Sequence, residues 1–486
     1  MITKKFRHTK LWATTTNIIL IIILINIILS FFSFSVDLSA NKIHSLSPAT
    51  KDIIANSNDI ITIKPFVSSN LPPQLIPIKE TLKNILGQYQ RFGRGKIKII
   101  WVDPQKDDQA KSEALSLGIA PLQFSSVQQD KFQVVQGYFG LAVFLAEKKQ
   151  VIPALQDINN LEYQLTATIK RLQQDELAQI GFTTGTGETD QTKLSKISQL
   201  LRLNYQLTSV DLSKKTEKIN NGVKTLIIAG PKNKFSPEAK SAIKEYLDQK
   251  KGVIFLANKI AVGEGLAASE VDNDLDDFLE NYGIKINKNL VLDSSSGLAS
   301  FRTQQGGFIV PYPFWVKTRA ENAAHDLPPT ASLESVVFPW ISSLEISKGA
   351  QALWKSTPEA TVITDFNNLS PTTKRDFSNQ KQVVLAAIQT NGVKMAVVGD
   401  ADFIEDQTLG SYPENGQFFL NLVDYLSQDT KLISIRSKTV SSRPLKLINE
   451  KQKQTIKIIN LSAGPIILLL LTLIIRWRRK NAQKNY

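Results

Sequence analysis

The sequence predicts an α/β body held between two transmembrane helices. Strand-like segments alternate with amphipathic helices through most of the 486 residues, a pattern typical of parallel sheets covered by helices. Two uncharged apolar segments, 11–36 and 458–475, lie near the two ends, and about 20 apolar residues suffice for a helix to cross a bilayer. The chain has no cysteine, which excludes disulfides, a cysteine zinc site and a thiol nucleophile.

Basic residues flank both apolar segments and predict the orientation of the chain. Positive charge beside a span marks the cytoplasmic side, so the tails 1–10 and 476–486 are expected in the cytoplasm and 37–457 outside. The chain would then be a two-pass protein of the plasma membrane, with tails suited to anionic lipid. The residues that carry this prediction are Lys4, Lys5, Arg7, Lys10, Arg476, Arg478, Arg479 and Lys480.

Each apolar segment has an alternative interpretation. The first could be a cleaved signal peptide, although its apolar run is long for one and no clear A-x-A site precedes Asp37. The second could be a buried core helix, although Trp477 and the basic cluster beyond it favour a membrane interface. Nine basic tail residues supply most of the formal net charge of +14. The remaining body is weakly basic, which argues against nucleic-acid binding.

The first soluble unit is predicted over 37–176, with the order β-α-β-α-β-β-α. Ser47 and Pro48 have the character of an N-cap and a first helical residue. This order resembles a thioredoxin-like layer in topology only, because there is no C-x-x-C and therefore no redox chemistry. The predicted strands are 60–67, 96–102, 121–127, 132–146 and 150–153, and the main predicted helices are 78–92 and 158–172.

The second unit is predicted over 177–436 as a doubly wound parallel sheet. Segment 223–229 is almost wholly apolar, as expected of a strand buried on both faces. The segments 263–273 and 294–329 are interpreted as a loop and an irregular insertion, since Gly, Ala, Ser, Gln and Pro are frequent there. A last short strand at 432–436 precedes a linker, 437–457. The other predicted strands are 179–184, 205–212, 252–257, 383–389 and 394–399, with an extended segment at 284–292, and the helices are 193–203, 236–249, 274–282 and 415–427.

A glycine-rich turn follows the first strand of the second unit. Gly185, Thr186, Gly187 and Glu188 could cradle an anion with backbone N–H groups at a helix start. The turn lacks the lysine and the spacing of a P-loop, and it is not G-x-G-x-x-G. A tight strand-to-helix turn is the favoured interpretation.

An acidic loop follows the last strand of the predicted parallel sheet. Asp400 and Asp402 lie where open α/β sheets place their ligand sites. Paired carboxylates could hold calcium, but capping of the next turn is the favoured role. The three histidines, His8, His44 and His325, share no metal spacing, and no G-x-S-x-G motif is present. We therefore expect no enzymatic activity and no cofactor.

Several short motifs, taken in order, resemble those of the gliding-motility auxiliary family, the GldG-like proteins. None is specific alone, and their order carries the resemblance over most of the chain. Thr186 departs from it, because the family often has His there. The motifs are Val36-Asp37-Leu38-Ser39, His44-Ser45-Leu46-Ser47-Pro48-Ala49-Thr50, Trp101-Val102-Asp103-Pro104, Leu161-Glu162-Tyr163-Gln164-Leu165-Thr166, Gly185-Thr186-Gly187-Glu188, Leu226-Ile227-Ile228-Ala229-Gly230-Pro231 and Val398-Gly399-Asp400-Ala401-Asp402-Phe403.

The resemblance implies a membrane-anchored auxiliary or substrate-binding subunit of an ABC-type transport system. Its partners would be a permease and an ATPase, because this chain has no Walker motif of its own. The resemblance also implies that the second unit is an amidotransferase-like sheet without the catalytic cysteine. A structural envelope protein that binds cell-wall polymer is the main alternative, and a hydrolase with an unrecognised site is a third. The resemblance gives neither the transported substrate nor a part in gliding.

Overall fold

The computed structural model describes residues 45–427 except 129–130, 156–159, 175, 215–218, 304–305 and 332, together with 453–462 and a few single positions nearer the ends. The predicted spans 11–36 and 458–475 lie largely outside the described residues, and both basic tails lie wholly outside them. In the part of the chain that is described, no helix combines the length and the apolar character that a membrane crossing needs.

The first unit is a four-stranded sheet with helices, in the order β2-β1-β5-β6. Strand β1 pairs parallel with β2 and antiparallel with β5. The predicted strand 132–146 is two strands, because β4 pairs with β3 in a separate hairpin. The elements are α2 (Pro48–Ala55), β1 (Ile61–Val67), α3 (Ile76–Phe92), β2 (Ile97–Ile99), α4 (Asp108–Ser116), β3 (Leu122–Gln128), β4 (Lys131–Gly137), β5 (Phe139–Leu145), β6 (Lys148–Ile152) and α5 (Leu161–Gln173).

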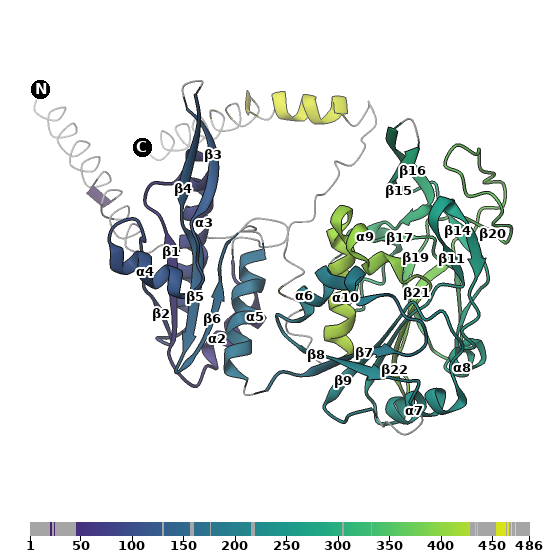
Figure 1. The fold of residues 1–486 in the computed structure, drawn as a ribbon. Coiled ribbons are helices and arrows are strands. Elements are labelled where there is room, and N and C mark those ends of the chain that lie inside the picture. The colour runs from purple at the N-terminus through teal and green to yellow at the C-terminus, as the bar shows by residue number, and fades with distance from the viewer. Residues whose placement is uncertain are drawn as a thin grey trace, which may run out of the picture. The chain divides into compact units, whose positions relative to one another are not determined.

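The second unit is built on a nine-stranded sheet flanked by helices (Figure 1). The sheet contains β7 (Gln179–Thr184), β8 (Gln206–Asp211), β9 (Val223–Ala229), β10 (Gly252–Leu256), β13 (Ile284–Ile286), β18 (Leu344–Ile346), β19 (Gln351–Lys355), β21 (Val384–Gln389) and β22 (Lys394–Val398). Its helices are α6 (Ser195–Leu201), α7 (Pro237–Asp248), α8 (Asp276–Asn281), α9 (Asp406–Ser411) and α10 (Pro413–Leu426).

Five neighbouring strands of this sheet are parallel, in the order β8-β7-β9-β10-β22. The predicted parallel sheet is therefore confirmed. Beyond β22 the sheet turns antiparallel through β21, β18, β19 and β13. The chain places β8 on one side of β7 and returns to place β9 on the other. This reversal is a topological switch point, the position at which such sheets bind ligands.

Alternate residues of the central strands pack into two separate cores, because side chains of a strand point to opposite faces. Ile227 and Ile254 belong to the core that contains α6 and α10. Leu226 and Val253 belong to the core that contains α7 and α8. Helices cover both faces, which explains why strands such as β9 are almost wholly apolar.

The predicted irregular insertion at 294–329 is wrong, because most of it is a hairpin. Strands β15 (Ser296–Thr303) and β16 (Gly306–Lys317) pair antiparallel, and β16 also pairs with β17 (Val337–Pro339). Alternate residues of β16, Tyr312 and Phe314, are fully buried and provide the apolar face that holds the hairpin. The frequent Gly, Ser and Pro residues obscure the strand pattern of alternating apolar residues in the sequence.

Two smaller predictions are also wrong. The predicted loop at 263–273 contains part of a short hairpin, in which β11 (Ile260–Val262) pairs with β12 (Ala268–Glu270). In the predicted strand at 432–436 the described residues, Ile433 and Ile435, are helical. A further antiparallel pair joins β14 (Leu290–Leu292) to β20 (Thr361–Ile363), where no strand is predicted for β20.

Candidate functional site

Four loops meet at the carboxyl edge of the parallel strands and line one pocket. They follow β7, β9, β10 and β22, and contribute Glu188, Pro231, Asn258 and Asp402 respectively. The pocket has a volume of about 1160 Å³. Its position outside the strand ends, beside the switch point, is the expected place for a ligand in this architecture.

The glycine turn after β7 is held by its own side chains. The backbone N–H of Thr186 donates to one carboxylate oxygen of Glu188 at 2.8 Å, and the Thr186 hydroxyl donates to the other at 2.7 Å. The Thr186 carbonyl accepts from the backbone N–H groups of Lys232 and Asn233. The Thr186 N–H, which in the less favoured interpretation would meet an anion, thus serves the chain's own carboxylate, and the turn is fastened to the loop after β9.

Gly185 and Gly187 are required by the backbone of this turn. Both have positive φ, 101° and 75°, in the region that side-chain-bearing residues rarely adopt. A Cβ atom at Gly185 would lie 2.8 Å from Asp211 Oδ1 and from Ser213 N. The conformation of the turn therefore explains why glycine occupies these two positions, without any ligand.

Asp400 is buried in the protein interior and supports the loop after β22. Its side chain is fully buried, and its Oδ1 accepts the backbone N–H of Asp402 at 2.7 Å. This bond between a side chain and the backbone two residues on stabilises the short turn Asp402–Ile404. Burial, followed by the nearby charge of Asp402, raises the pKa of Asp400 well above its ordinary value, which favours the protonated acid.

Asp402 lies at the pocket wall and has an unusual acidity. Burial and the neighbouring Glu405 raise the pKa of Asp402 to about 7. Lys193 and the Asn258 amide oppose this rise because each favours the charged carboxylate. Asp402 therefore changes its charge near neutral pH, which ordinary aspartates do not do.

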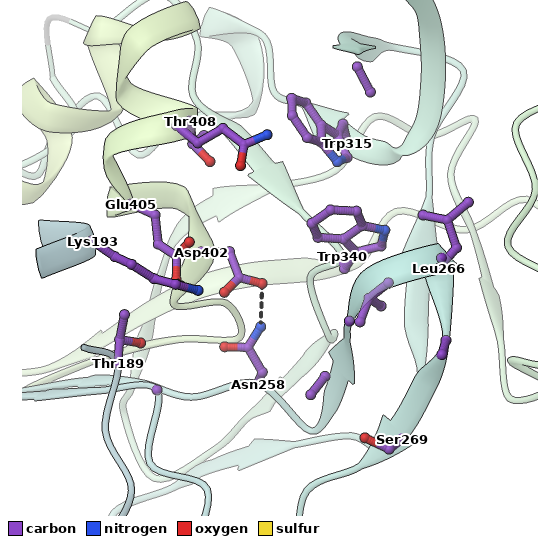
Figure 2. Close-up of a pocket in the computed structure, with 18 of the residues that line it drawn as sticks. Thr189, Lys193, Asn258, Leu266, Ser269, Trp315, Trp340, Asp402, Glu405 and Thr408 are labelled. Carbon is purple, nitrogen blue, oxygen red and sulfur yellow. Dashed lines mark hydrogen bonds and ion pairs between the residues drawn. The ribbon is translucent and has the colours of Figure 1, made fainter. Parts of the chain in front are cut away.

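The pocket has a polar side and an aromatic side (Figure 2). On the polar side the Lys193 ammonium lies 3.5 Å from Glu405 Oε1. On the other side the indole rings of Trp315 and Trp340 meet edge to face, with centroids 5.7 Å apart and planes at 86°. Phe301 of β15 extends this wall, to which β16 contributes Trp315.

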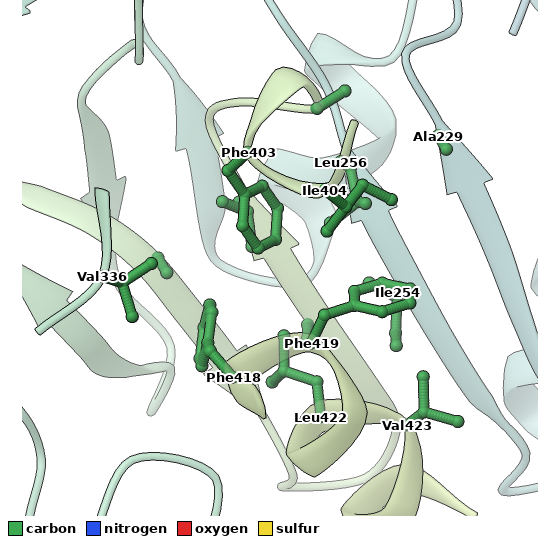
Figure 3. Close-up of a cluster of buried hydrophobic side chains, with 14 of the residues drawn as sticks. Ala229, Ile254, Leu256, Val336, Phe403, Ile404, Phe418, Phe419, Leu422 and Val423 are labelled. Carbon is green, nitrogen blue, oxygen red and sulfur yellow. The ribbon is translucent and has the colours of Figure 1, made fainter. Parts of the chain in front are cut away.

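The acidic loop rests on a packed aromatic core, which gives the site a rigid base. Phe403 and Ile404, directly after Asp402, lie against Phe418 and Phe419 of α10 (Figure 3). All four side chains are fully buried. A site on such a base keeps its geometry without a ligand, because packed side chains resist displacement.

The structure brings the two predicted loops together, since Glu188 and Asp402 line the same pocket. It also adds residues that the sequence did not single out, chiefly Lys193, Asn258, Trp315 and Trp340. The position of Asn258, two residues after β10, was a usable signal. Across the described ranges, no group of three or more His, Asp or Glu side chains is placed to hold a metal ion.

Comparison with known proteins identifies the class of this chain. Residues 178–428 match the family model described as ABC-type uncharacterized transport system, and residues 40–144 match a domain of unknown function. The first match covers more than half of the chain. The chain therefore belongs to this family of ABC transport auxiliary components.

Individual relatives add little about function. An uncharacterized protein of Borreliella burgdorferi is 23% identical over 95% of this chain and 97% of its own length. The intraflagellar transport protein 52 homolog of Homo sapiens is 35% identical over 111 residues, which are 23% of this chain and 22% of that protein.

Two solved structures that resemble part of this chain have low TM-scores. The mmIFT52 N-terminal domain has a TM-score of 0.39 and 21% identity, and the match covers 51% of this chain and 97% of that one. A putative GMP synthase component from Thermoplasma acidophilum has a TM-score of 0.29 and 9% identity, with 52% and 96% covered.

Proposed function

We propose that the chain is the membrane-anchored, extracytoplasmic auxiliary subunit of an ABC-type transport system and that it binds a ligand in its carboxyl-edge pocket. The pocket at the topological switch point is the observation that carries the binding role. Family membership supports the auxiliary role, and the motif order that resembles GldG-like proteins agrees with it. The two apolar segments and their basic flanks support the anchoring.

The chemistry of the pocket supports binding, and neither cysteine nor histidine occurs among its described lining residues. The chain has no cysteine. At this edge β9 ends in Ala229 and is followed by Gly230 and Pro231, none of which carries a nucleophilic side chain. None of the described residues that line the pocket is a histidine, so no serine or threonine there has the usual base beside it. The carboxylates contact groups of the protein itself, Glu188 and Asp190 within their own turns and Asp402 and Glu405 across to other segments.

The proposed partners are a permease and an ATPase. Two spans do not enclose a solute path, because polar groups along it would face lipid, and the chain lacks a nucleotide-binding motif. The spans are the proposed contact surface, since small and polar residues let helices pack closely in lipid. The first segment contains Ala13, Asn17 and Asn26, and the second contains Asn460 and Gly464.

Co-purification tests this assignment. Full-length chain extracted in a mild detergent is expected to bring down an ABC permease and an ATPase, identified by mass spectrometry. A variant with both apolar segments replaced by poly-Leu of equal length should lose them while its body stays folded. Recovery of neither protein with the wild-type chain would refute the transport role. If the poly-Leu variant retains both proteins, the contact with them lies in the body and not in the spans.

A further inference from the structure

We propose that the pocket binds a neutral oligosaccharide, with its sugar rings against the tryptophan wall and its hydroxyl groups against the polar side. This saccharide proposal depends on the proposed function only because both treat the pocket as a ligand-binding site. Four properties of the pocket support it: the aromatic wall, the charges, the neutral polar groups and the volume.

The aromatic wall fits the flat C–H face of a sugar ring. Aromatic rings carry negative charge on their faces, which attracts the weakly positive C–H groups of a pyranose. Trp340 holds its indole there from a backbone with φ of 52°, a conformation that is strained for a large side chain. Strain of this kind is typical of functional sites, and here it fixes an indole that lines the pocket.

The acidic groups of the pocket already have partners within the protein. Glu188 accepts from Thr186, and Asp190 accepts from Thr192 at 2.8 Å. Glu405 pairs with Lys193, and Asp402 accepts from Asn258 at 3.1 Å. No arginine, the residue best suited to grip phosphate or carboxylate, is among the described pocket residues. Lys193 and Lys232 are the cationic side chains of the described lining, against four carboxylates that each have a partner, so the charges call for neither an anion nor a strongly cationic ligand.

Neutral groups that both donate and accept hydrogen bonds complete the lining. Thr189, Ser269, Ser300 and Gln407 come from four different segments. A sugar hydroxyl is itself both donor and acceptor, so it matches hydroxyl and amide side chains. Such groups spread around a cavity suit a ligand whose hydroxyls point in several directions.

The size of the pocket also bears on the kind of ligand it can hold. The volume of about 1160 Å³ exceeds the usual range for one small molecule, roughly 300–1,000 Å³, and so favours several sugar rings.

The test uses the full-length chain in mild detergent. It is applied to a glycan array and then titrated by calorimetry with cellotetraose, maltotetraose and chitotetraose. Acetylcholine and inorganic phosphate are titrated as cationic and anionic comparators. We expect at least one glycan to bind, with a change in tryptophan fluorescence. Trp340→Ala should weaken this binding about tenfold or more, as loss of a central tryptophan typically does.

Two further variants keep the test decisive. Trp101→Ala removes a tryptophan that is 42% exposed in the first unit, and it should bind as the wild type does. Ser269→Trp, at an exposed position of β12, should block the pocket without disturbing the core, and so covers the case in which Trp340→Ala fails to fold.

Each contrary result has its own meaning. Glycan binding that survives both Trp340→Ala and Ser269→Trp would overturn the pocket as its site. Binding of acetylcholine or phosphate without any glycan would overturn the saccharide class and leave a ligand-binding role. No binding by any probe would overturn the saccharide proposal, while the recovery of permease and ATPase decides the transport role separately.

Discussion

The side-chain amide of Asn258 donates a hydrogen bond to Asp402 Oδ2 at 3.1 Å. Its carbonyl oxygen accepts the backbone N–H of Ala401 at 2.8 Å. One amide therefore ties the end of β10 to the loop after β22, two segments more than 140 residues apart in the chain. This tie sets the position of Asp402, the pocket carboxylate whose pKa is raised to about 7.

Asn258→Ala is expected to destabilise the second unit by about 1–3 kcal/mol, because the buried Ala401 N–H loses its acceptor. Chemical denaturation followed by circular dichroism measures this change. The pKa of Asp402 should also rise, since a hydrogen bond to its charged form is lost. The exposed Asn221→Ala should change stability by less than about 0.5 kcal/mol. Equal effects of the two variants would contradict the role of Asn258.

Asp402→Asn is expected to alter the pH dependence of stability. The pKa of Asp402 is about 7 in the folded chain and about 3.9 in an unfolded one. The folded state therefore holds this proton more tightly, and the resulting stabilisation is present below about pH 4 and lost as pH rises through about 7.

Thermal melts between about pH 4 and pH 8.5 provide the measurement. The variant and the wild type should melt together at the acid end, and the variant should melt several degrees higher above pH 7. At this size, 1 kcal/mol corresponds to about 2–4 °C. Asp277→Asn, at an exposed position of α8, controls for the removal of a charge. Parallel curves for wild type and Asp402→Asn would show that Asp402 titrates normally.

Phe418→Ala is expected to cost about 3–5 kcal/mol, the usual range for truncating a buried aromatic residue. The Phe418 ring lies 6.0 Å from that of Phe403 and 6.2 Å from that of Trp354. The cavity would open directly beneath the Asp402 loop, so ligand affinity should fall together with stability. Leu200→Ala, on α6 and 37% exposed, is the matched truncation and should cost far less. A small loss for Phe418→Ala would contradict the packing in Figure 3.

Gly185→Ala is expected to destabilise the turn after β7 by about 1–3 kcal/mol. The residue would be forced to positive φ, and its Cβ would crowd Asp211. Gly118→Ala shares the positive φ, 77°, but its Cβ would meet open space. The difference between the two unfolding free energies therefore isolates the steric contribution. No difference would mean that the crowding is relieved by movement of Ser213.

Single cysteines test the proposed topology, and the absence of native cysteine makes the experiment clean. Ser39→Cys and Ser437→Cys are expected to react with a membrane-impermeant maleimide on intact cells, because both lie between the proposed spans. Asn485→Cys should react only after lysis. Labelling of Asn485→Cys on intact cells, or protection of Ser437→Cys, would refute the two-span arrangement.

The parallel half of the sheet was predictable because its strands are buried on both faces and alternate with helices. Ser236 caps α7 through the Ala239 N–H, as its Ser-Pro-Glu sequence indicates. The β15–β16 hairpin was not predictable from composition, since Pro311 and Pro313 lie within β16 and proline is normally excluded from central strands. Only tertiary packing around Tyr312 and Phe314 reveals it.

The candidate site was predictable in part. The loops of Glu188 and Asp402 each follow a recognisable strand, so both could be placed at the carboxyl edge. Trp315 and Trp340 had no such signal, because they come from β16 and from the segment after β17, which follow none of the parallel strands directly. Likewise, the raised pKa of Asp402 depends on burial, which no short motif records.

The two sides of the pocket have separate origins in the chain. The polar side comes from short loops fixed to the ends of β7, β9, β10 and β22, whereas the tryptophan side comes from the continuous stretch between β10 and β22. The β15–β16 hairpin lies within that stretch and takes no part in the pairing of the parallel strands. A change confined to that hairpin would therefore alter the wall that contains Trp315, while the parallel strands keep the Asp402 loop in place.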